Sequence, residues 1–450
     1  MNQPIRVPTW GELAARGPLA MTAEVAVMNK SAIALAADSA VTTGEETGPK
    51  VFNTANKLFA LSKYRPVGVM IFGNAEFMAV PWETIIKFYR SRLANVSFAH
   101  LTDYAHHFLD FLQQEQELLW PPQIQEQFFT GTIAAYFQFI LDEINGEVSK
   151  TLSAGEPLPE PAIIDLASEI IKRHREEWDQ ADPLSQIPPG QQAEIEATYR
   201  SRIDEALART FQSLPLQPPV LADLRSIAAQ LFSKKRFSDS ASGLVIAGFG
   251  EEEIFPTAVT YALEGVINGR LKYDQADLAT ASRENSASIL PFAQSEMVNT
   301  FMEGIDPSLK KAVDAYLQEL ITSYPHRILD AIPDLPPERR QALATILVDT
   351  AKEVSQGFDS EIQAYIHVRH IQPVLDAVAA LPKDELAAMA EALVNLTSFK
   401  KRVTLETETV GGPIDVAVIS KGDGFIWIKR KHYFRPDLNQ SFFANYYREG

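Results

Sequence analysis

The sequence predicts an α+β protein in which two helical blocks interrupt a β core. Short-strand patterns fill residues 22–73, return at 243–273 and return again at 403–430, with helical patterns between them. Strands that meet across such insertions indicate a central sheet system with helices packed outside it. The chain has 450 residues, 46 % of them hydrophobic and 22 % charged, a balance that provides large cores and excludes wholesale disorder.

The first β region opens with a predicted hairpin at 22–37. The segment TAEVAVM is followed by the polar turn NKS and then by AIALAA. Apolar residues alternate in the first arm, a pattern that suits a strand with one buried face. Further strands are predicted at 57–62 and 67–73, so this region is compact antiparallel β structure.

The two helical blocks differ in sequence pattern. The first runs from residue 77 to about 236 and is broken by proline pairs; its clearest helical spacing lies at 82–93, 102–119 and 128–144. The second runs from about 293 to about 400. It contains a duplicated pattern, LDAIPDLPPERRQALATILV at 329–348 and LDAVAALPKDELAAMAEALV at 375–394. Two copies predict a repeated helical hairpin for packing or oligomer contacts rather than a solenoid.

The later β regions predict two more strand pairs. GLVIAGFG at 243–250 and TAVTYALEGVINGRLKY at 257–273 form the middle region. VTLETETV and PIDVAVISKGDGFIWIKR form the last one, and the Asp423-Gly424 dipeptide between apolar runs predicts a hairpin turn.

Composition excludes several classes of function. The chain has no cysteine, which rules out disulfide scaffolds, thiol peptidases and cysteine-ligated metal sites. Its 41 basic and 58 acidic residues give a net charge of −17, which disfavours binding to nucleic acid and to anionic membranes. No signal peptide is recognised in the first 21 residues and no apolar run reaches membrane-spanning length, so we expect a cytoplasmic protein.

Familiar metal and nucleotide motifs are also missing. The adjacent pair His106-His107 and the pair His367 and His370 lack a carboxylate spaced to complete a zinc site. GxGxxG, Walker A, HExxH and nucleophile-elbow motifs do not occur. We therefore expect no cofactor and no metal.

Thr22 is the candidate nucleophile. It opens the first strand, and Asp38 follows the paired strand. A threonine hydroxyl needs a base beside it, and a free α-amine on the same residue, with a pKa of about 8, is such a base. A lysine tunes that amine and a buried carboxylate holds the lysine, roles for which Lys57 and Asp38 are the local candidates. The alternative is that threonine starts this strand through β propensity alone.

The segment MTAEVAVMNKSAIALAADSAVTTG resembles the opening of proteasome β subunits, of the bacterial HslV peptidase and of the proteasome-like Anbu proteins. The resemblance implies that Thr22 becomes an N-terminal nucleophile, by removal of a propeptide or by initiation at Met21. Asp38 matches the family's aspartate, and Lys57 its lysine, with Lys50 as the weaker alternative. Thr42 and Gly44 match the residues that line the substrate cleft.

Two further site residues come from the same resemblance. Gly73 in FGNAEF matches the glycine whose N–H forms the oxyanion hole, and Ser295 is what remains of a Gly-Ser-Gly motif. The family's supporting Asp and Ser before Gly411 are replaced by Thr407 and Val410. That difference favours the alternative of an inactive assembly subunit.

The resemblance also implies a fold and an organisation. The fold is the four-layer αββα sandwich of the N-terminal nucleophile hydrolases, here with two large helical insertions. The expected segments are an extension or propeptide at 1–21, core parts at 22–95, 241–305 and 396–450, and helical insertions at 96–240 and 306–395.

The activity implied is hydrolysis of amide bonds, in peptides or proteins, through an acyl-enzyme. A small-molecule amidase or acylase is the other enzymatic alternative, because a fold by itself does not determine a substrate. Relatives form rings or helical arrays, so we expect a homo-oligomer, and the sequence names no unfoldase partner.

Overall fold

The computed structural model of the chain describes residues 22–43, 50–52, 55–155, 157–238, 241–332, 335–403, 411–432, 434–441 and 444. The protein is a mixed α+β protein, 55 % helix and 20 % strand, and its sheets are antiparallel. The described residues divide into two compact units. Unit 1 contains Phe59–Glu253 and Thr257–Ala279, and unit 2 contains the rest.

Unit 2 is built on a five-stranded sheet of order β12-β1-β2-β13-β14. Its strands, far apart in the sequence, are β1 (Ala23–Asn29), β2 (Ala32–Ala37), β12 (Ala287–Ala293), β13 (Asp415–Ser420) and β14 (Gly424–Lys429). The predicted hairpins β1–β2 and β13–β14 are confirmed. The sequence did not predict β12, which pairs along the whole of β1.

Strand β1 is buried on both faces, which corrects the prediction of a single buried face. All seven of its residues are buried, including Glu24. Ala23, Val25 and Val27 belong to a core that β1 shares with β2, β13 and helices of unit 2. The other face of β1 therefore carries a buried carboxyl group rather than a solvated one.

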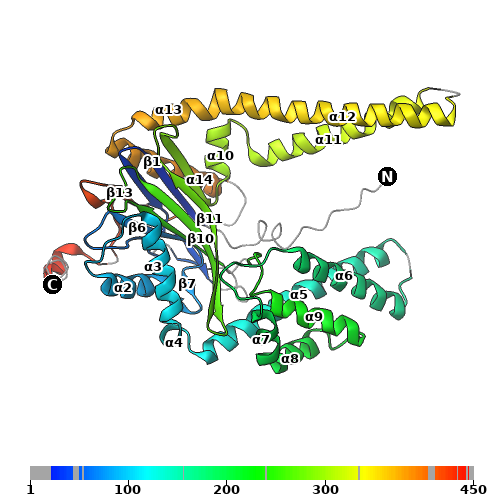
Figure 1. Cartoon of the computed structure of the whole chain (residues 1–450), viewed down its shortest axis with the longest axis horizontal. Helices are drawn as coiled ribbons and strands as arrows, with labels where there is room; N and C mark the ends of the chain where they lie inside the picture. The colour runs from blue at the N-terminus through cyan, green and yellow to red at the C-terminus, as the bar shows by residue number, and fades with distance from the viewer. Residues whose placement is uncertain are drawn as a thin grey trace. The chain divides into compact units, whose positions relative to one another are not determined.

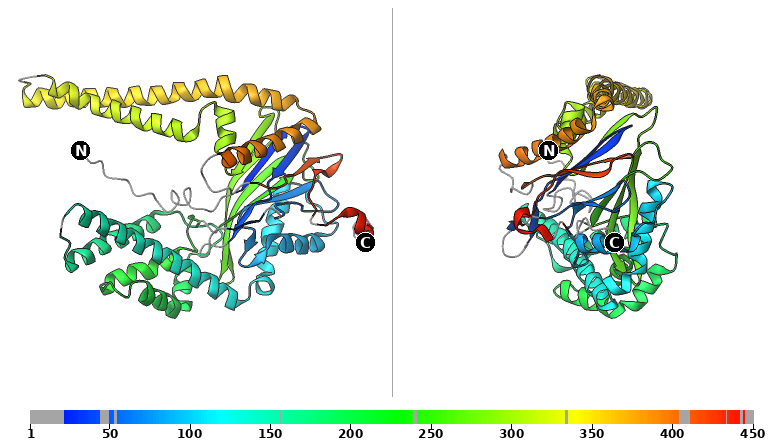
Figure 2. Two further views of the ribbon diagram at one scale, coloured as in Figure 1. Left: turned by 180° about the vertical axis from the view of Figure 1, so that it is seen from behind. Right: turned by 90° about the vertical axis from the view of Figure 1, so that its left-hand side faces the viewer.

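Three helices of unit 2 contribute side chains to the sheet's core. They are α10 (Glu296–Glu303), α13 (Gln372–Ala380) and α14 (Lys383–Val403). Their ribbons lie beside the sheet in Figures 1 and 2. Asn29, at the end of β1, donates hydrogen bonds from its side-chain amide to the carbonyls of Val378, at 3.1 Å, and Leu381, at 2.9 Å. The carbonyl of Val378 also accepts the backbone N–H of Leu381, the C-cap of α13, at 3.1 Å, so Asn29 adds a second donor there and fixes the end of the helix to β1.

Two long helices, α11 (Pro307–Asp330) and α12 (Pro337–Ile366), run side by side away from this sheet in Figure 1. A π-helical turn, η1 (His367–Ile371), joins α12 to α13. Both copies of the duplicated pattern lie across helix–helix junctions, the first between α11 and α12 and the second between α13 and α14. Few residues of α11 and α12 are buried, so this hairpin has little core of its own.

Unit 1 contains the second five-stranded sheet, of order β11-β10-β9-β6-β5. Its strands are β5 (Leu58–Ala60), β6 (Val67–Gly73), β9 (Ser242–Gly248), β10 (Thr257–Ile267) and β11 (Arg270–Thr280). The central strand β9 pairs antiparallel with both β6 and β10. The end residues Leu58 and Thr280 of the outer strands are assigned to unit 2.

Helices fill the remainder of unit 1. They are α2 (Trp82–Leu93), α3 (Leu101–Gln114), α4 (Gln116–Leu119), α5 (Pro122–Ser153), α6 (Glu160–Gln180), α7 (Gln191–Thr198), α8 (Arg200–Thr210) and α9 (Pro218–Gln230). Helices α2 and α3 share an aromatic-rich core with the sheet, and α5, α6, α8 and α9 surround a second core. The helices predicted at 82–93, 102–119 and 128–144 are confirmed, the second being divided into α3 and α4.

Smaller elements complete the described chain. They are the strand pairs β3 (Val41–Thr43) with β4 (Lys50–Phe52) and β7 (Glu76–Phe77) with β8 (Val80–Pro81), and the 3-10 turn η2 (Pro436–Leu438). The strand expected in VTLETETV lies outside the described residues apart from its first residue, Val403, which ends α14. Within the residues that the structure describes, no helix is long and apolar enough to cross a membrane.

Candidate active site

Unit 2 brings together three of the predicted site residues and one that was not predicted. Thr22, Asp38 and Lys57 lie with Glu24 in a buried polar cluster. Their exposed fractions are 3 % for Thr22, 0 % for Asp38, 4 % for Lys57 and 0 % for Glu24. We call these four residues the Thr22 cluster.

The β1–β2 hairpin explains how the cluster forms. Side chains two residues apart point to the same side of a strand, so Thr22 and Glu24 share one side of the β1 line. The register pairs Glu24 with Ala37, which brings the next residue, Asp38, beside Ala23. The backbone N–H of Asp38 donates to the carbonyl of Ala23 at 3.1 Å, and the N–H of Ala23 donates to Asp38 Oδ1 at 3.4 Å.

Asp38 is held through both of its carboxyl oxygens. Lys57 Nζ donates to Oδ1 at 2.5 Å, and the backbone N–H of Gly411 donates to Oδ2 at 3.0 Å. The segment carrying Gly411 is fixed in turn, because the carbonyl of Gly411 accepts from the N–H of Ser39 at 3.2 Å. Asp38 therefore anchors both the lysine and the entry to β13, as the predicted lysine-holding role requires.

Glu24 links the hydroxyl to the lysine. Thr22 Oγ1 donates a hydrogen bond to Glu24 Oε2 at 3.0 Å, and Lys57 Nζ lies 3.3 Å from Glu24 Oε1. One ammonium group thus faces two buried carboxyl groups. The sequence signal for this residue was a glutamate two positions after the threonine, on the same side of the same strand.

Burial controls the protonation of the two carboxyl groups. It raises the pKa of Glu24 to about 8; the charge of Asp38 adds to that increase, and Lys57 and the Thr22 hydroxyl oppose it. Burial also raises the pKa of Asp38, against the opposing effects of Lys57 and of the N–H groups of Gly411 and Ala23. Burial therefore favours the protonated form of both carboxyl groups, and one of them, Glu24, lies beside the threonine hydroxyl.

The backbone before α10 completes the surroundings of Thr22. Gln294 donates its backbone N–H to the carbonyl of Thr22 at 3.2 Å. The preceding residue, Ala293, has a φ of 57°, in the left-handed region that a residue with a Cβ rarely occupies. Gln294 Oε1 is buried and has no hydrogen-bond partner among the described residues. The sequence did not predict Gln294, although the expected Gly-Ser-Gly position pointed at this segment.

Ser295 lies one residue further on, at the N-cap of α10. Its carbonyl accepts the N–H of Asn299 at 2.8 Å, and its side chain makes no capping hydrogen bond. Among the described contacts its hydroxyl is not part of the Thr22 cluster. The structure thus places Ser295 next in sequence to the Thr22 neighbour Gln294 without bringing it into the network.

The remaining predicted residues lie elsewhere or outside the described chain. The backbone of Thr42 pairs with that of Val51 between β3 and β4, while Gly44 lies outside the described residues. Gly73 ends β6 in unit 1 with a φ of 80°, and a Cβ there would lie 2.9 Å from the carbonyl oxygen of Ala241. Glycine is therefore required at that position by the backbone of unit 1 itself.

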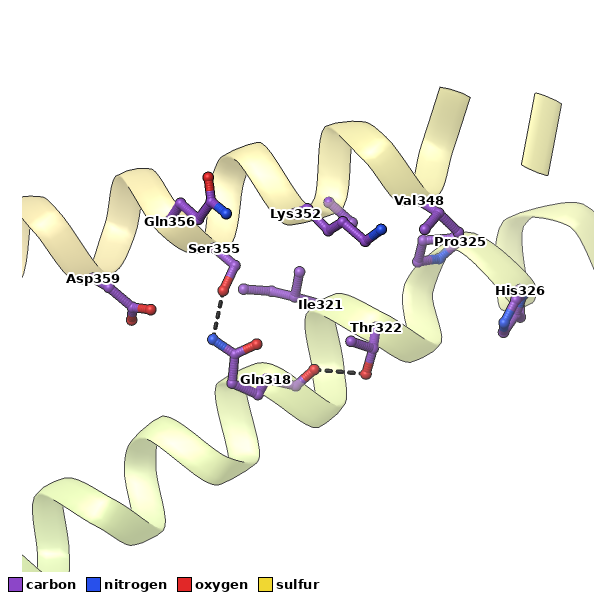
Figure 3. A pocket seen from close by; sticks show the side chains of 11 residues that line it. Gln318, Ile321, Thr322, Pro325, His326, Val348, Lys352, Ser355, Gln356 and Asp359 are labelled. Carbon is purple, nitrogen blue, oxygen red and sulfur yellow. Dashed lines mark hydrogen bonds between the residues drawn. The ribbon is translucent and has the colours of Figure 1, made fainter. Parts of the chain in front are cut away.

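Residues Thr407 and Val410, which replace the family's supporting Asp and Ser, lie outside the described residues. Within the described part of the chain no three histidine, cysteine, aspartate or glutamate residues gather as a metal site. A groove of about 430 Å³ lies between α11 and α12 in unit 2, where Gln318 Nε2 donates to Ser355 Oγ at 2.5 Å (Figure 3). Its lining contains none of the Thr22 cluster.

Comparison of the chain with protein-family models, with curated proteins and with solved structures finds no match. The chemistry of the site therefore has to be argued from its own geometry and from the resemblance of the first β region.

Proposed function

We propose that the protein is a threonine hydrolase of the N-terminal nucleophile type that cleaves amide bonds. One observation carries the proposal. Lys57, buried in an ion pair with Asp38, also lies against Glu24, and Glu24 accepts the hydrogen bond of the Thr22 hydroxyl. A hydroxyl, a lysine and a buried aspartate are the parts that the proteasome-like resemblance requires, and they meet although they lie before β1, after β2 and before β5. Peptide bonds are the substrate that the resemblance favours.

In the proposed reaction Thr22 Oγ1 attacks the amide carbonyl carbon. The free α-amine of Thr22 takes the hydroxyl proton in the reaction that the resemblance implies, and the amine leaving group departs with a proton. An ester on Thr22 remains, which water hydrolyses. Lys57 sets the electrostatic environment of the hydroxyl, and Asp38 keeps the ammonium group in place. The oxyanion role of Gly73 and the cleft roles of Thr42 and Gly44 stay predictions.

The fold that goes with this function is the four-layer αββα sandwich with helical insertions. In its support, each unit holds a five-stranded antiparallel sheet, and each sheet shares a core with helices. The proposed insertion at 96–240 contains helices α3 to α9, and the one at 306–395 contains α11, α12, α13 and the first part of α14. A homo-oligomer remains the proposed assembly.

An inactive assembly subunit is the second candidate. Two observations favour it: Thr22 is only 3 % exposed, and Thr407 and Val410 stand where the family has Asp and Ser. In that case the Thr22 cluster would serve only to stabilise the β1–β2 hairpin, and substitution of the hydroxyl would change stability without removing any activity.

Turnover of unstructured fluorogenic peptides, compared with small acyl amides, tests the proposal. Wild type should hydrolyse the peptides and the Thr22→Ala variant should not, while Thr22→Ser retains part of the rate. Thr397→Ala is the matched control, because Thr397 is another buried threonine of unit 2, and its hydroxyl donates to the carbonyl of Leu393 within its own helix. Equal rates in wild type and Thr22→Ala would refute the proposal, and hydrolysis of acyl amides alone would show an amidase.

A further inference from the structure

Glu24 has no counterpart among the residues that the resemblance assigns, yet its carboxyl group accepts a hydrogen bond from the Thr22 hydroxyl at 3.0 Å. We propose that Glu24 is a catalytic base of Thr22, which takes the hydroxyl proton directly through its side chain. The inference rests on the proposed function, because it needs Thr22 to be a nucleophile. It goes beyond that function because it gives the nucleophile a base other than its own α-amine.

The geometry is that of an activated nucleophile. Such sites place the nucleophile and the base within about 2.6–3.2 Å of each other, with a third group that orients the base. Thr22 Oγ1 donates to Glu24 Oε2 at 3.0 Å. Lys57 Nζ lies 3.3 Å from the other carboxyl oxygen, Oε1. Hydroxyl, base and orienting group are therefore all present, and Asp38 fixes the orienting group through a 2.5 Å contact.

The charge balance of the Thr22 cluster argues that the carboxyl group of Glu24 does more than fill space in the core. Lys57 already has a partner in Asp38, so an ionised Glu24 leaves one buried negative charge in excess. Burying an uncompensated charge is strongly unfavourable, and such a group instead retains a proton. A purely structural position would be served by an apolar side chain or an amide. A carboxyl group that readily gains and loses its proton suits a base.

The protonation of Glu24 agrees with this role. The charged and polar groups that face it are Lys57, Asp38 and the Thr22 hydroxyl. With burial they place its pKa at about 8, so both forms are present near neutral pH. A general base works best when its pKa lies close to the operating pH.

The step balances as follows. The bond from Thr22 Oγ1 to the amide carbonyl carbon forms, the carbonyl π electrons move to its oxygen, and the hydroxyl proton passes to Glu24 Oε2. The electron pair on oxygen then re-forms the carbonyl, the C–N bond breaks with its electrons going to nitrogen, and Glu24 gives its proton to that nitrogen. A water molecule then attacks the ester, Glu24 takes the proton of the water, and it returns the proton to Thr22 Oγ1 as the acid product leaves.

The rate of acylation of Thr22 by a threonine-directed β-lactone, followed by mass spectrometry from pH 6 to pH 9.5, tests this role. Wild type is expected to show a rate that rises with a midpoint near pH 8. Glu24→Gln should lower the rate by about 10²–10⁴-fold and lose the rise, since the amide cannot accept the proton. Glu24→Asp should keep a rise with pH at a reduced rate, because it retains a carboxyl group. Thermal unfolding of each variant identifies any that does not fold, and the Asp variant then carries the test.

Four outcomes separate the inference from the function on which it rests. One outcome is acylation of Thr22 in chains whose mass shows that residues before Thr22 are still attached. That result supports Glu24 as the base, because the α-amine of Thr22 is then part of a peptide bond. A Glu24→Gln variant with the wild-type rate and pH profile overturns the inference alone and leaves the α-amine as the base. A folded Glu24→Asp variant that shows no rise with pH also overturns the inference. Failure of wild type to react at Thr22 at any pH overturns both proposals.

Discussion

Two buried lysines, one in each unit, form similar ion pairs in different surroundings. Lys57 in unit 2 and Lys272 in unit 1 are 4 % and 1 % exposed, and each lies against a buried glutamate. Lysine and glutamate are rarely buried unless they are paired, so both sites require an explanation. The difference lies in what else each lysine contacts.

Lys272 has a hydrogen-bond acceptor for each of its three ammonium protons. Its ammonium group donates to the carbonyl of Leu231 at 2.6 Å, to the carbonyl of Arg236 and to Glu264, which accounts for its three protons. It also lies 4.6 Å from the ring centre of Phe237. Burial lowers the pKa of Lys272, and Glu264 opposes that effect. One ammonium group and one carboxylate balance, and the pair ties β10 and β11 to the segment after α9.

Lys57 instead faces two carboxyl groups, and one of them accepts the hydrogen bond of a hydroxyl. The Lys57 site thus has one more carboxyl group than it has ammonium groups, whereas the Lys272 site has one of each. Burial and pairing are common to both lysines, so the proposed function rests on the additional carboxyl group beside the Thr22 hydroxyl.

The largest expected effect separates the two lysines by activity. Lys57→Met should lower amide hydrolysis by about 10²–10⁴-fold, because the cation that orients the base is lost. Lys272→Met should leave the activity per folded molecule at the wild-type level. Peptide turnover normalised to folded protein measures both, and a large loss of activity in Lys272→Met would remove the distinction.

A second prediction concerns stability in unit 1. Lys272→Met leaves Glu264 buried without its partner and should lower the unfolding free energy by about 3–5 kcal/mol. The double variant Glu264→Leu with Lys272→Met removes both charges and should recover most of that loss. Urea unfolding followed by the fluorescence of the tryptophans, three of which are fully buried in unit 1, measures the change. A single variant as stable as wild type would show that the pair contributes nothing.

A third prediction uses pH to examine Glu24. Its pKa rises from 4.5 to about 8 on folding, so the folded chain binds more protons than the unfolded chain between those values. The contribution of Glu24 to the unfolding free energy therefore falls as pH increases from about 4.5 to about 8. Glu24→Gln lacks this term, and its stability relative to wild type should increase with pH over that range. Unfolding curves at pH 5 and pH 8 measure it; a constant difference would contradict the assigned pKa.

The smallest expected change in stability, at an exposed ion pair, serves as a reference for the buried pair of Lys272. Glu83 and Lys87 form an i,i+4 ion pair on the surface of α2, with side chains 37 % and 55 % exposed. Such pairs contribute about 0.3–0.5 kcal/mol. Lys87→Met should therefore change the unfolding free energy by less than about 0.5 kcal/mol, against the much larger change at Lys272. A comparable loss at both positions would argue that burial is not the cause.

Local sequence patterns were enough to predict the elements whose contacts join residues close together in the sequence. The hairpin β1–β2 and the helix α2 follow from alternation, turn residues and helical spacing. The meeting of Asp38 with Lys57 was expected from the chemistry that a threonine nucleophile needs, and the resemblance assigned the same roles to both. Local spacing alone does not bring those two residues to one point.

Contacts between distant segments were not predictable. Strand β12 contains Pro291 and starts within a polar stretch, and it is a strand because it pairs with β1 at the edge of the sheet, where a proline is tolerated. The N–H of Gly411 reaches Asp38 for the same non-local reason. Glu24 was missed because alternation was taken to mean one solvated face, whereas tertiary packing buries both.

The most direct test of the central claim is the location of the acyl group after wild-type protein reacts with a threonine-directed electrophile. Peptide mapping by mass spectrometry should place it on Thr22, with no adduct in Thr22→Ala and an unchanged adduct in Thr397→Ala. An adduct on another residue would contradict the assignment of Thr22 as the nucleophile. So would a wild-type protein that forms no adduct and does not hydrolyse the fluorogenic peptides.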